Sequence, residues 1–129
     1  MSYDPFGCPI RYWSALFGDK WSLLIVRDIM LKGRHNYGEF QNAGERISTS
    51  VLANRLNHLE EHGIIRKLPD KEHGKKFIYS LTDKGKDLAD IILAIIDWAE
   101  KYDSKTLVET EFIKTLRENP EDIKKELKL

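Results

Sequence analysis

Small polar side chains repeat along the segment 47–63, ISTSVLANRLNHLEEHG. Hydroxyl, carboxamide and imidazole groups can form hydrogen bonds with the base edges that DNA displays in its major groove. The side chains of this kind are Thr49, Ser50, Asn54, Asn57 and His58. Arg55 lies among them, and we expect it to reach a phosphate from the flank of the segment. The chemistry that this segment predicts is recognition of nucleic acid.

A helix has to present these side chains. Ser48 can cap its start, no Gly or Pro occurs in the next fourteen residues, and Gly63 supplies a stop. Leu52, Leu56 and Leu59 fall in one stripe at helical spacing, and Ser50, Asn54, Asn57 and Glu61 cluster on the opposite side. The pattern predicts a helix over residues 48–62. A capped surface helix without a binding role explains the same pattern and stays an alternative.

The residues before this helix complete a helix-turn-helix pattern. The tetrapeptide NYGE resembles a capping box, in which Asn36 caps a helix and Glu39 reaches back. We expect a short helix to about residue 43, with Tyr37 and Phe40 directed inward, and a turn that contains Gly44.

A β-hairpin is predicted after the helix, with strands over residues 64–68 and 76–81 and the loop PDKEHG between them. From residue 64 to 76 there are five basic and two acidic residues, a local balance of +3. A hairpin of this charge after a helix-turn-helix is typical of a wing that contacts phosphates or the minor groove. The candidate wing contacts are Lys71, His73, Lys75 and Lys76. A solvated hairpin with scattered lysines is the alternative.

The remaining segments form the scaffold. Residues 9–17 and 20–31 fit two helices, and the second is apolar on more than one side, as a core helix is. A helix over residues 83–102 has surplus apolar surface, which favours a homodimer, although other helices of the same chain can cover it. Two further helices are expected, one from Ser104 and one after Asn119-Pro120.

The predicted fold class is therefore mainly α with a small β-hairpin, a winged helix-turn-helix. We expect residues 1–102 to form the DNA-binding domain with its dimerisation helices, and residues 103–129 to form a C-terminal helical extension.

Composition limits the function classes. The 129 residues are 41% hydrophobic, enough for one compact domain, and 21 basic and 21 acidic residues give a net charge of zero. DNA contacts therefore have to come from local patches. The start of the chain lacks the layout of a signal peptide and the longest apolar run is too short for a bilayer, so we expect no membrane association and a cytoplasmic location.

Enzyme motifs are missing from the sequence. It contains no phosphate-binding glycine loop, nucleophile elbow or dinucleotide fingerprint, so we predict neither enzyme activity nor a cofactor. His58-Leu59-Glu60-Glu61-His62 matches the HxxEH pattern of zinc peptidases, but the match is short and Leu59 belongs to the core stripe. We predict no metal site. The main rival to DNA binding is a winged-helix protein-interaction adaptor.

Several stretches together resemble the HxlR family of bacterial transcriptional regulators. They are CP at residues 8–9, GDKWSLLIVRDI, NYGEFQNAGERISTSVLANRLNHLEEHGIIRK, YSLTDKGKDL and IIDWAEKY. The resemblance covers about residues 8–102 and implies a winged helix-turn-helix, similar in kind to MarR proteins. It also implies a homodimer that binds a pseudo-palindromic operator in double-stranded DNA, with two copies of the 48–62 helix in successive major grooves, roughly 34 Å apart.

Cys8, the only cysteine, precedes Pro9 at the expected start of a helix, where unpaired backbone amides favour a thiolate. Some members of the HxlR family respond to oxidants or electrophiles through a cysteine at the corresponding place. The resemblance therefore implies Cys8 as a redox or electrophile sensor, and a small buried cysteine is the alternative. A small-molecule effector is a further expected partner, for which Trp13, Phe17 and Trp98 offer apolar surface, although core packing also accounts for them.

Overall fold

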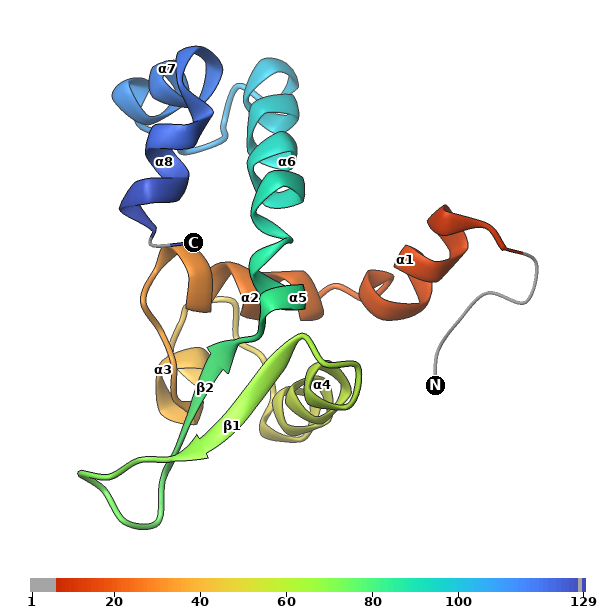
Figure 1. The fold of residues 1–129 in the computed structure, drawn as a ribbon, viewed down its shortest axis with the longest axis vertical. Helices are drawn as coiled ribbons and strands as arrows, with labels where there is room; N and C mark the ends of the chain where they lie inside the picture. Colours follow the sequence, from red (N-terminus) through yellow and green to blue (C-terminus); the bar gives the residue numbers. More distant parts are fainter. Residues whose placement is uncertain (1–6, 128) are drawn as a thin grey trace. The chain divides into compact units, whose positions relative to one another are not determined.

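The computed structural model describes residues 7–127 and 129, which form two compact units. We call residues 1–85 the winged unit and residues 86–129 the C-terminal unit. The described residues confirm a mainly helical fold with a two-stranded antiparallel hairpin (Figure 1). No helix among them is both long and apolar enough to cross a membrane.

The helices and strands of the winged unit follow the predicted order. They are α1 (Pro9–Phe17), α2 (Ser22–Leu31), α3 (Tyr37–Gln41), α4 (Thr49–Glu61), β1 (Ile65–Pro69), β2 (Phe77–Leu81) and α5 (Asp83–Lys86), which ends just past the boundary between the units. The strands pair with Lys67 opposite Tyr79 and with Pro69 opposite Phe77. The hairpin extends away from the helices of this unit (Figure 1).

Both ends of α4 are set by local sequence. The Ser48 hydroxyl accepts a hydrogen bond from the Val51 amide at 3.3 Å, which confirms the predicted cap. At the other end Gly63 has a φ of 71°, and the amides of Gly63 and Ile64 donate to the carbonyls of Glu60 and Leu59. This is a Schellman ending, which needs a left-handed residue that glycine adopts without strain. The strand β1 begins two residues after Gly63, at Ile65.

The predicted capping box of α3 is present with one difference. The Asn36 side chain accepts from the Glu39 amide at 2.9 Å, as expected. The Glu39 carboxylate, however, accepts from the amide of His35, one residue before the cap. Phe40 is buried as predicted, whereas Tyr37 is only half-buried.

The core of the winged unit is built on α2 and α4. Ile25 and Val26 of α2 and the stripe of Leu52, Leu56 and Leu59 are buried, which confirms α2 as a core helix and the inward face of α4. The buried Asp28 carboxylate accepts hydrogen bonds from Arg27 and Arg34, which hold the end of α2 to the following loop.

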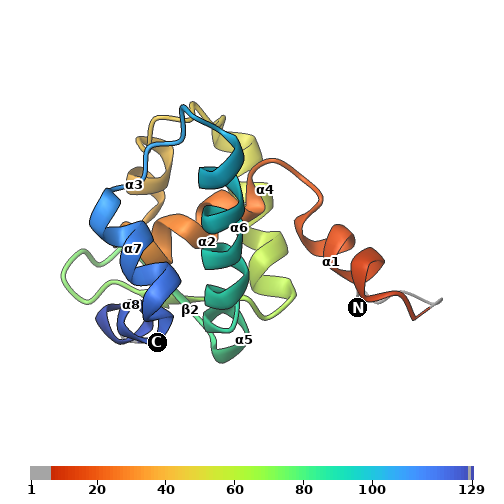
Figure 2. The ribbon, with the colours of Figure 1, turned by 90° about the horizontal axis from the view of Figure 1, so that it is seen from above.

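The C-terminal unit contains α6 (Ala89–Tyr102), α7 (Thr110–Glu118) and α8 (Pro120–Glu126), with α7 and α8 beside α6 (Figures 1 and 2). Its core consists of Leu93, Ile113, Leu116 and Ile123. On the surface Arg117 binds Asp97 and Glu100, and the hydrogen bond from Arg117, helped by Lys101, lowers the pKa of Asp97. The assignment of residues 103–129 as an extension stays a prediction.

Two predicted helix boundaries are wrong. The helix expected over residues 83–102 is divided by a turn at residues 87–88. The Thr82 hydroxyl caps its first part, α5, in which a side chain at Gly85 would lie 2.2 Å from the Ile64 carbonyl, so α5 packs closely against the residue that precedes β1. The helix expected from Ser104 begins at Thr110, because the Asp103 carboxylate binds the Lys105 amide and the Thr106 hydroxyl in a local turn.

Candidate nucleic-acid interface

The polar face of α4 is open to solvent. Ser50, Asn54 and Asn57 are exposed on the side opposite the buried leucine stripe, and Thr49 is exposed in the first turn. Because α4 is capped at both ends and anchored by its apolar face, it holds these four side chains on a fixed helical frame. Hydroxyl and carboxamide groups in such an arrangement can meet base edges in a major groove.

Tyr37 ties α3 to the start of α4. Its hydroxyl donates to the Thr49 carbonyl at 2.8 Å. That carbonyl lies in the first turn of α4, beside two of the exposed polar side chains. Tyr37 therefore positions the helix rather than filling the core, a role that the sequence pattern did not predict.

Arg55 takes part in a contact that sequence reasoning missed. Its Nη1 lies 3.2 Å from an oxygen of Asp19, and its Nη2 and Nε donate to the Asn54 side-chain oxygen at 2.6 and 3.1 Å. The same Asp19 carboxylate accepts from the amides of Trp21 and Ser22 at the start of α2, both at 2.9 Å. Arg55 thus links α4 to the α1–α2 connection, and its expected phosphate contact stays a prediction.

Burial and hydrogen bonding act in opposite directions on Asp19. Burial alone would raise the pKa of this carboxyl, but the hydrogen bonds from Ser22 and Trp21 and the charge of Arg55 outweigh it. The pKa of Asp19 is therefore below its ordinary value of 3.8, and the group is ionised at neutral pH.

His58 differs from the other candidates on α4 because it is half-buried. Its Nε2 lies 2.8 Å from the Leu16 carbonyl, which joins α4 to α1. His62 Nδ1 lies 2.8 Å from the His58 carbonyl, so both rings of the HxxEH match are directed at backbone oxygens. Within residues 7–127 and 129, no group of three or more metal-binding side chains comes together. The base contact expected of His58 stays a prediction.

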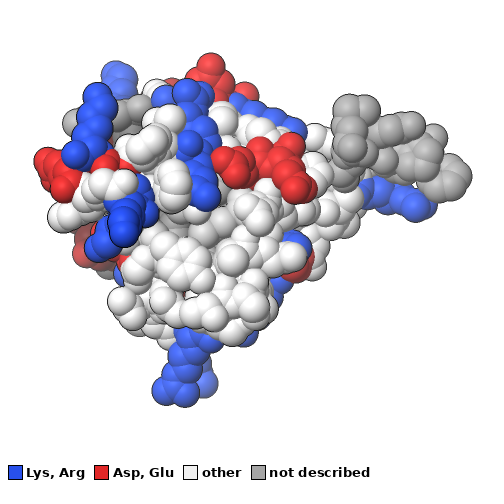
Figure 3. Space-filling model, turned by 90° about the horizontal axis from the view of Figure 1, so that it is seen from below, with Lys and Arg blue, Asp and Glu red and all other residues white. Residues whose placement is uncertain are grey.

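The wing carries its cations at the outer end. Lys71, His73, Lys75 and Lys76 are exposed, and the loop is closed by the Asp70 amide donating to the Lys76 carbonyl at 2.9 Å. The space-filling view shows Lys and Arg side chains, with acidic side chains among them, on the side where the hairpin extends, next to a broad area without charged side chains (Figure 3). A positive edge beside a neutral, hydrogen-bonding face suits a phosphate backbone that borders a groove.

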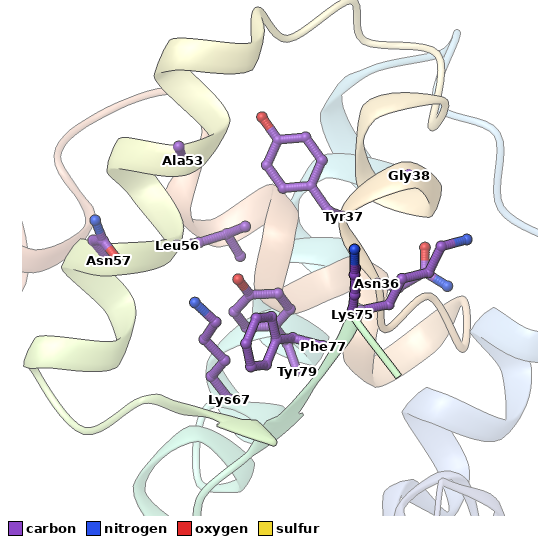
Figure 4. Close-up of a pocket in the computed structure, with 11 residues that line it drawn as sticks. Asn36, Tyr37, Gly38, Ala53, Leu56, Asn57, Lys67, Lys75, Phe77 and Tyr79 are labelled. Atoms are coloured by element: carbon purple, nitrogen blue, oxygen red, sulfur yellow. The ribbon is translucent and has the colours of Figure 1, made fainter. Parts of the chain in front are cut away.

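A cavity of about 600 Å³ lies between α3, α4 and the wing (Figure 4). Leu56, Phe77 and Tyr79 supply apolar walls, and Asn57 and Lys75 are at its margin. The cavity therefore shares three residues with the candidate DNA contacts, Asn57, Lys75 and Lys76. Nothing in the sequence pattern predicted it, because its walls come from three separate elements.

Cys8 occupies the N-cap position of α1, as predicted, and is half-buried. Its carbonyl accepts from the Tyr12 amide at 3.1 Å. At the N-cap position the Cys8 thiol is close to the positive end of the dipole of α1.

One apolar stripe in the C-terminal unit is exposed. Ile91, Ile95, Trp98 and Tyr102 follow one another at helical spacing along α6, and the exposed fractions of Trp98 and Tyr102 are 66% and 74%. Large aromatic side chains this exposed are typical of an interaction surface.

Comparisons with known proteins agree on one family. The profile of the HxlR-like helix-turn-helix family matches residues 16–107. YdeP of Bacillus subtilis (strain 168), an uncharacterised HTH-type transcriptional regulator, is 33% identical over 102 residues, which cover 78% of this chain and 79% of YdeP.

Solved structures match as well. The crystal structure of PA1607 has 36% identity and a TM-score of 0.74, and the match covers 84% of this chain and 77% of that one. The reduced form of the transcriptional regulator YodB from B. subtilis has 27% identity and a TM-score of 0.62, and the match covers 78% of this chain and 98% of YodB. Quinone-bound and diamide-treated forms of YodB match too.

Proposed function

Because this chain belongs to the HxlR-like helix-turn-helix family and is therefore a DNA-binding transcriptional regulator and not an enzyme, we propose that it reads its operator through α4. The base contacts are assigned to Thr49, Ser50, Asn54 and Asn57. The observation that carries this proposal is their shared exposure on α4, where Ser50, Asn54 and Asn57 lie opposite the buried leucines and Thr49 lies in the first turn. The adaptor alternative is set aside, since the family consists of DNA-binding regulators.

The wing is assigned to the DNA backbone. Lys71, His73, Lys75 and Lys76 are exposed on an extended hairpin directly connected to α4, so they lie beside any groove that α4 enters. Contacts to phosphate orient a protein on the duplex without selecting a sequence. Arg55 and His58 are proposed as further DNA contacts from the flank of α4. DNA would compete there with the ion pair of Arg55 with Asp19 and with the contact of His58 with the Leu16 carbonyl.

A homodimer is the proposed active form. The exposed stripe of Ile91, Ile95, Trp98 and Tyr102 supports it, because a self-complementary helix face is the usual basis of a two-fold interface. In this proposed dimer the two copies of α4 would enter successive major grooves of a pseudo-palindromic operator, about 34 Å apart.

Cys8 is proposed as the sensor of electrophiles or oxidants. Its N-cap position supports the proposal, as does the likeness to YodB, which has been crystallised with a quinone bound and after diamide treatment. The Cys8 thiolate would add to a ring carbon of a quinone, and proton transfer would leave a thioether on a hydroquinone. With one cysteine per chain, diamide would instead oxidise two thiols to an intersubunit Cys8–Cys8 disulfide or to a mixed disulfide, and itself become the hydrazine.

Selection of bound duplexes from random double-stranded DNA tests the proposed operator reading. We expect enrichment of two related half-sites about one helical turn apart. Recovery of random sequences alone would overturn the proposal.

A further inference from the structure

Asp19 places a negative charge beside the proposed reading helix. One oxygen of its carboxylate lies 3.2 Å from Nη1 of Arg55 on α4, and the two side chains are only 27% and 24% exposed. Salt screens an ion pair that is shielded from water in this way less than one on an open surface. A carboxylate at this position also opposes the approach of phosphates, which lowers the affinity for DNA of every sequence.

The Asp19 carboxylate is held in place before DNA arrives. Its Oδ2 accepts from the amides of Trp21 and Ser22, and its Oδ1 accepts from the Ser22 hydroxyl at 2.7 Å. Ser22 is itself fully buried. The carboxylate therefore cannot turn away from Arg55 without losing its hydrogen bonds to the start of α2.

Arg55 is divided between two partners within the protein. Its Nη1 faces Asp19, while its Nη2 and Nε donate to the side-chain oxygen of Asn54. All three nitrogens of the guanidinium thus face oxygens of this chain. Because the Asn54 oxygen is neutral, it holds a guanidinium more weakly than a charged phosphate does. The charge of Asp19 is what keeps Arg55 in this arrangement.

We propose that Asp19 is a specificity-determining residue that acts through Arg55. It restrains the attraction of Arg55 to phosphate, which is the same for every sequence, and thereby keeps the Asn54 carboxamide in one orientation toward the base that it reads. Asp19 is thus a positioning residue and not a DNA contact. The inference rests on the proposed function, because it needs α4 in the groove.

The restraint is tested first in the protein without DNA. The oxygen of asparagine can still accept from the amides at the start of α2, so Asp19→Asn should fold, with a thermal midpoint close to that of the wild type. Asp19→Ser is a second uncharged variant whose side chain can accept from an amide. The side-chain NH₂ signals of Asn54 in NMR spectra should shift in both, as they should in Arg55→Gln. Unchanged Asn54 signals would overturn the restraint.

Binding to DNA measures the consequence for specificity. Asp19→Asn should bind a duplex of random sequence about threefold more tightly than the wild type, and its slope of log K against log salt should be steeper by up to about 1. For the selected operator, the loss of a fixed Asn54 should offset this gain, so the ratio of operator to random affinity should fall about threefold. A merely structural role would instead weaken binding to both duplexes. That result, or an unchanged ratio and slope, contradicts the proposal.

A double-mutant cycle separates the action through Arg55 from the general effect of one charge. In the Arg55→Gln protein, Asp19→Asn should leave the ratio and the slope unchanged, because its partner is missing. Glu72→Gln removes the same charge from an exposed position on the wing and should act equally in both backgrounds. Equal effects of Asp19→Asn in both backgrounds would refute the action through Arg55.

The wild type distinguishes a failure of this inference from a failure of the proposed function. A wild type that selects no operator overturns the proposed function and the inference with it. A wild type that selects an operator, together with an Asp19→Asn variant of equal specificity, overturns the inference alone.

Discussion

Arg55 holds the side-chain oxygen of Asn54 with two donors, Nη2 at 2.6 Å and Nε at 3.1 Å. The oxygen of the carboxamide is therefore engaged within the protein, and its NH₂ group is what α4 offers to a base at this position. An NH₂ donor matches the acceptors of guanine or thymine, whereas bidentate pairing with adenine needs the oxygen as well. Asp19 fixes Arg55 from the other side.

Replacing Asn54 should affect sequence discrimination. We expect Asn54→Ala to weaken binding to the selected operator by about 1 to 3 kcal/mol and to relax the preference at one base pair of each half-site. Gel-shift titrations with the operator and with single-base variants measure both effects. Asn119→Ala, in the C-terminal unit, is the control and should bind like the wild type. If Asn54→Ala distinguished the operator from its single-base variants as well as the wild type does, Asn54 would not be a base contact.

Replacing Lys75 should affect all DNA alike. Because this exposed lysine is assigned to a phosphate, Lys75→Ala should weaken operator and random DNA by the same factor. The slope of log K against log salt should fall by about 1. Fluorescence anisotropy at several salt concentrations gives the slope. Lys105→Ala removes an exposed lysine outside the winged unit and should leave the slope unchanged.

Replacing Trp98 should separate the subunits. A charge at this exposed position on α6 would be buried without a partner in the proposed dimer, so Trp98→Glu should sediment as a monomer and bind the operator at least about tenfold more weakly. Leu107→Glu is the matched control, since Leu107 is 99% exposed and lies outside the stripe. A Trp98→Glu dimer as stable as the wild type would place the interface elsewhere.

Replacing Cys8 should remove the response to electrophiles. Treatment with benzoquinone or diamide should change the operator affinity of the wild type and leave Cys8→Ser unaffected, because that variant has no thiol. Intact-mass spectrometry identifies the adduct or disulfide in the same samples. An identical response of the two proteins would show that Cys8 is not the sensor.

Acid should weaken the part of the fold that depends on Asp19. Since the folded-state pKa of Asp19 is lowered, its contribution to stability is fully present above its ordinary value of 3.8 and is lost as the pH falls through the folded-state pKa. Asp19→Ala should cost about 1 kcal/mol near pH 6, and the cost should be smaller at a pH well below the ordinary value of 3.8. Urea unfolding at both pH values measures it. Asp87→Ala, at an exposed aspartate, is the control.

Local signals predicted the helix-turn-helix and the wing well. The cap at Ser48, the stop at Gly63 and the stripe of Leu52, Leu56 and Leu59 all act over one or two turns, and the structure confirms each of them. The start of α7 was missed because a side-chain turn at Asp103 competes with a helix that its apolar spacing also permits.

Contacts between distant residues escaped the sequence pattern. Arg55 meets Asp19, and His58 meets the Leu16 carbonyl, across long separations in the chain. Neither residue type nor spacing indicates such a partner, since an exposed arginine on a helix fits a phosphate equally well. The cavity beside α4 was missed for the same reason, because its walls meet only after folding.

The Schellman ending at Gly63 leaves only Ile64 before β1, so a short connection joins α4 to the hairpin. We therefore expect α4 and the hairpin to rotate together. We therefore expect a change of target on this frame to come from exchanging individual side chains on α4 and the hairpin.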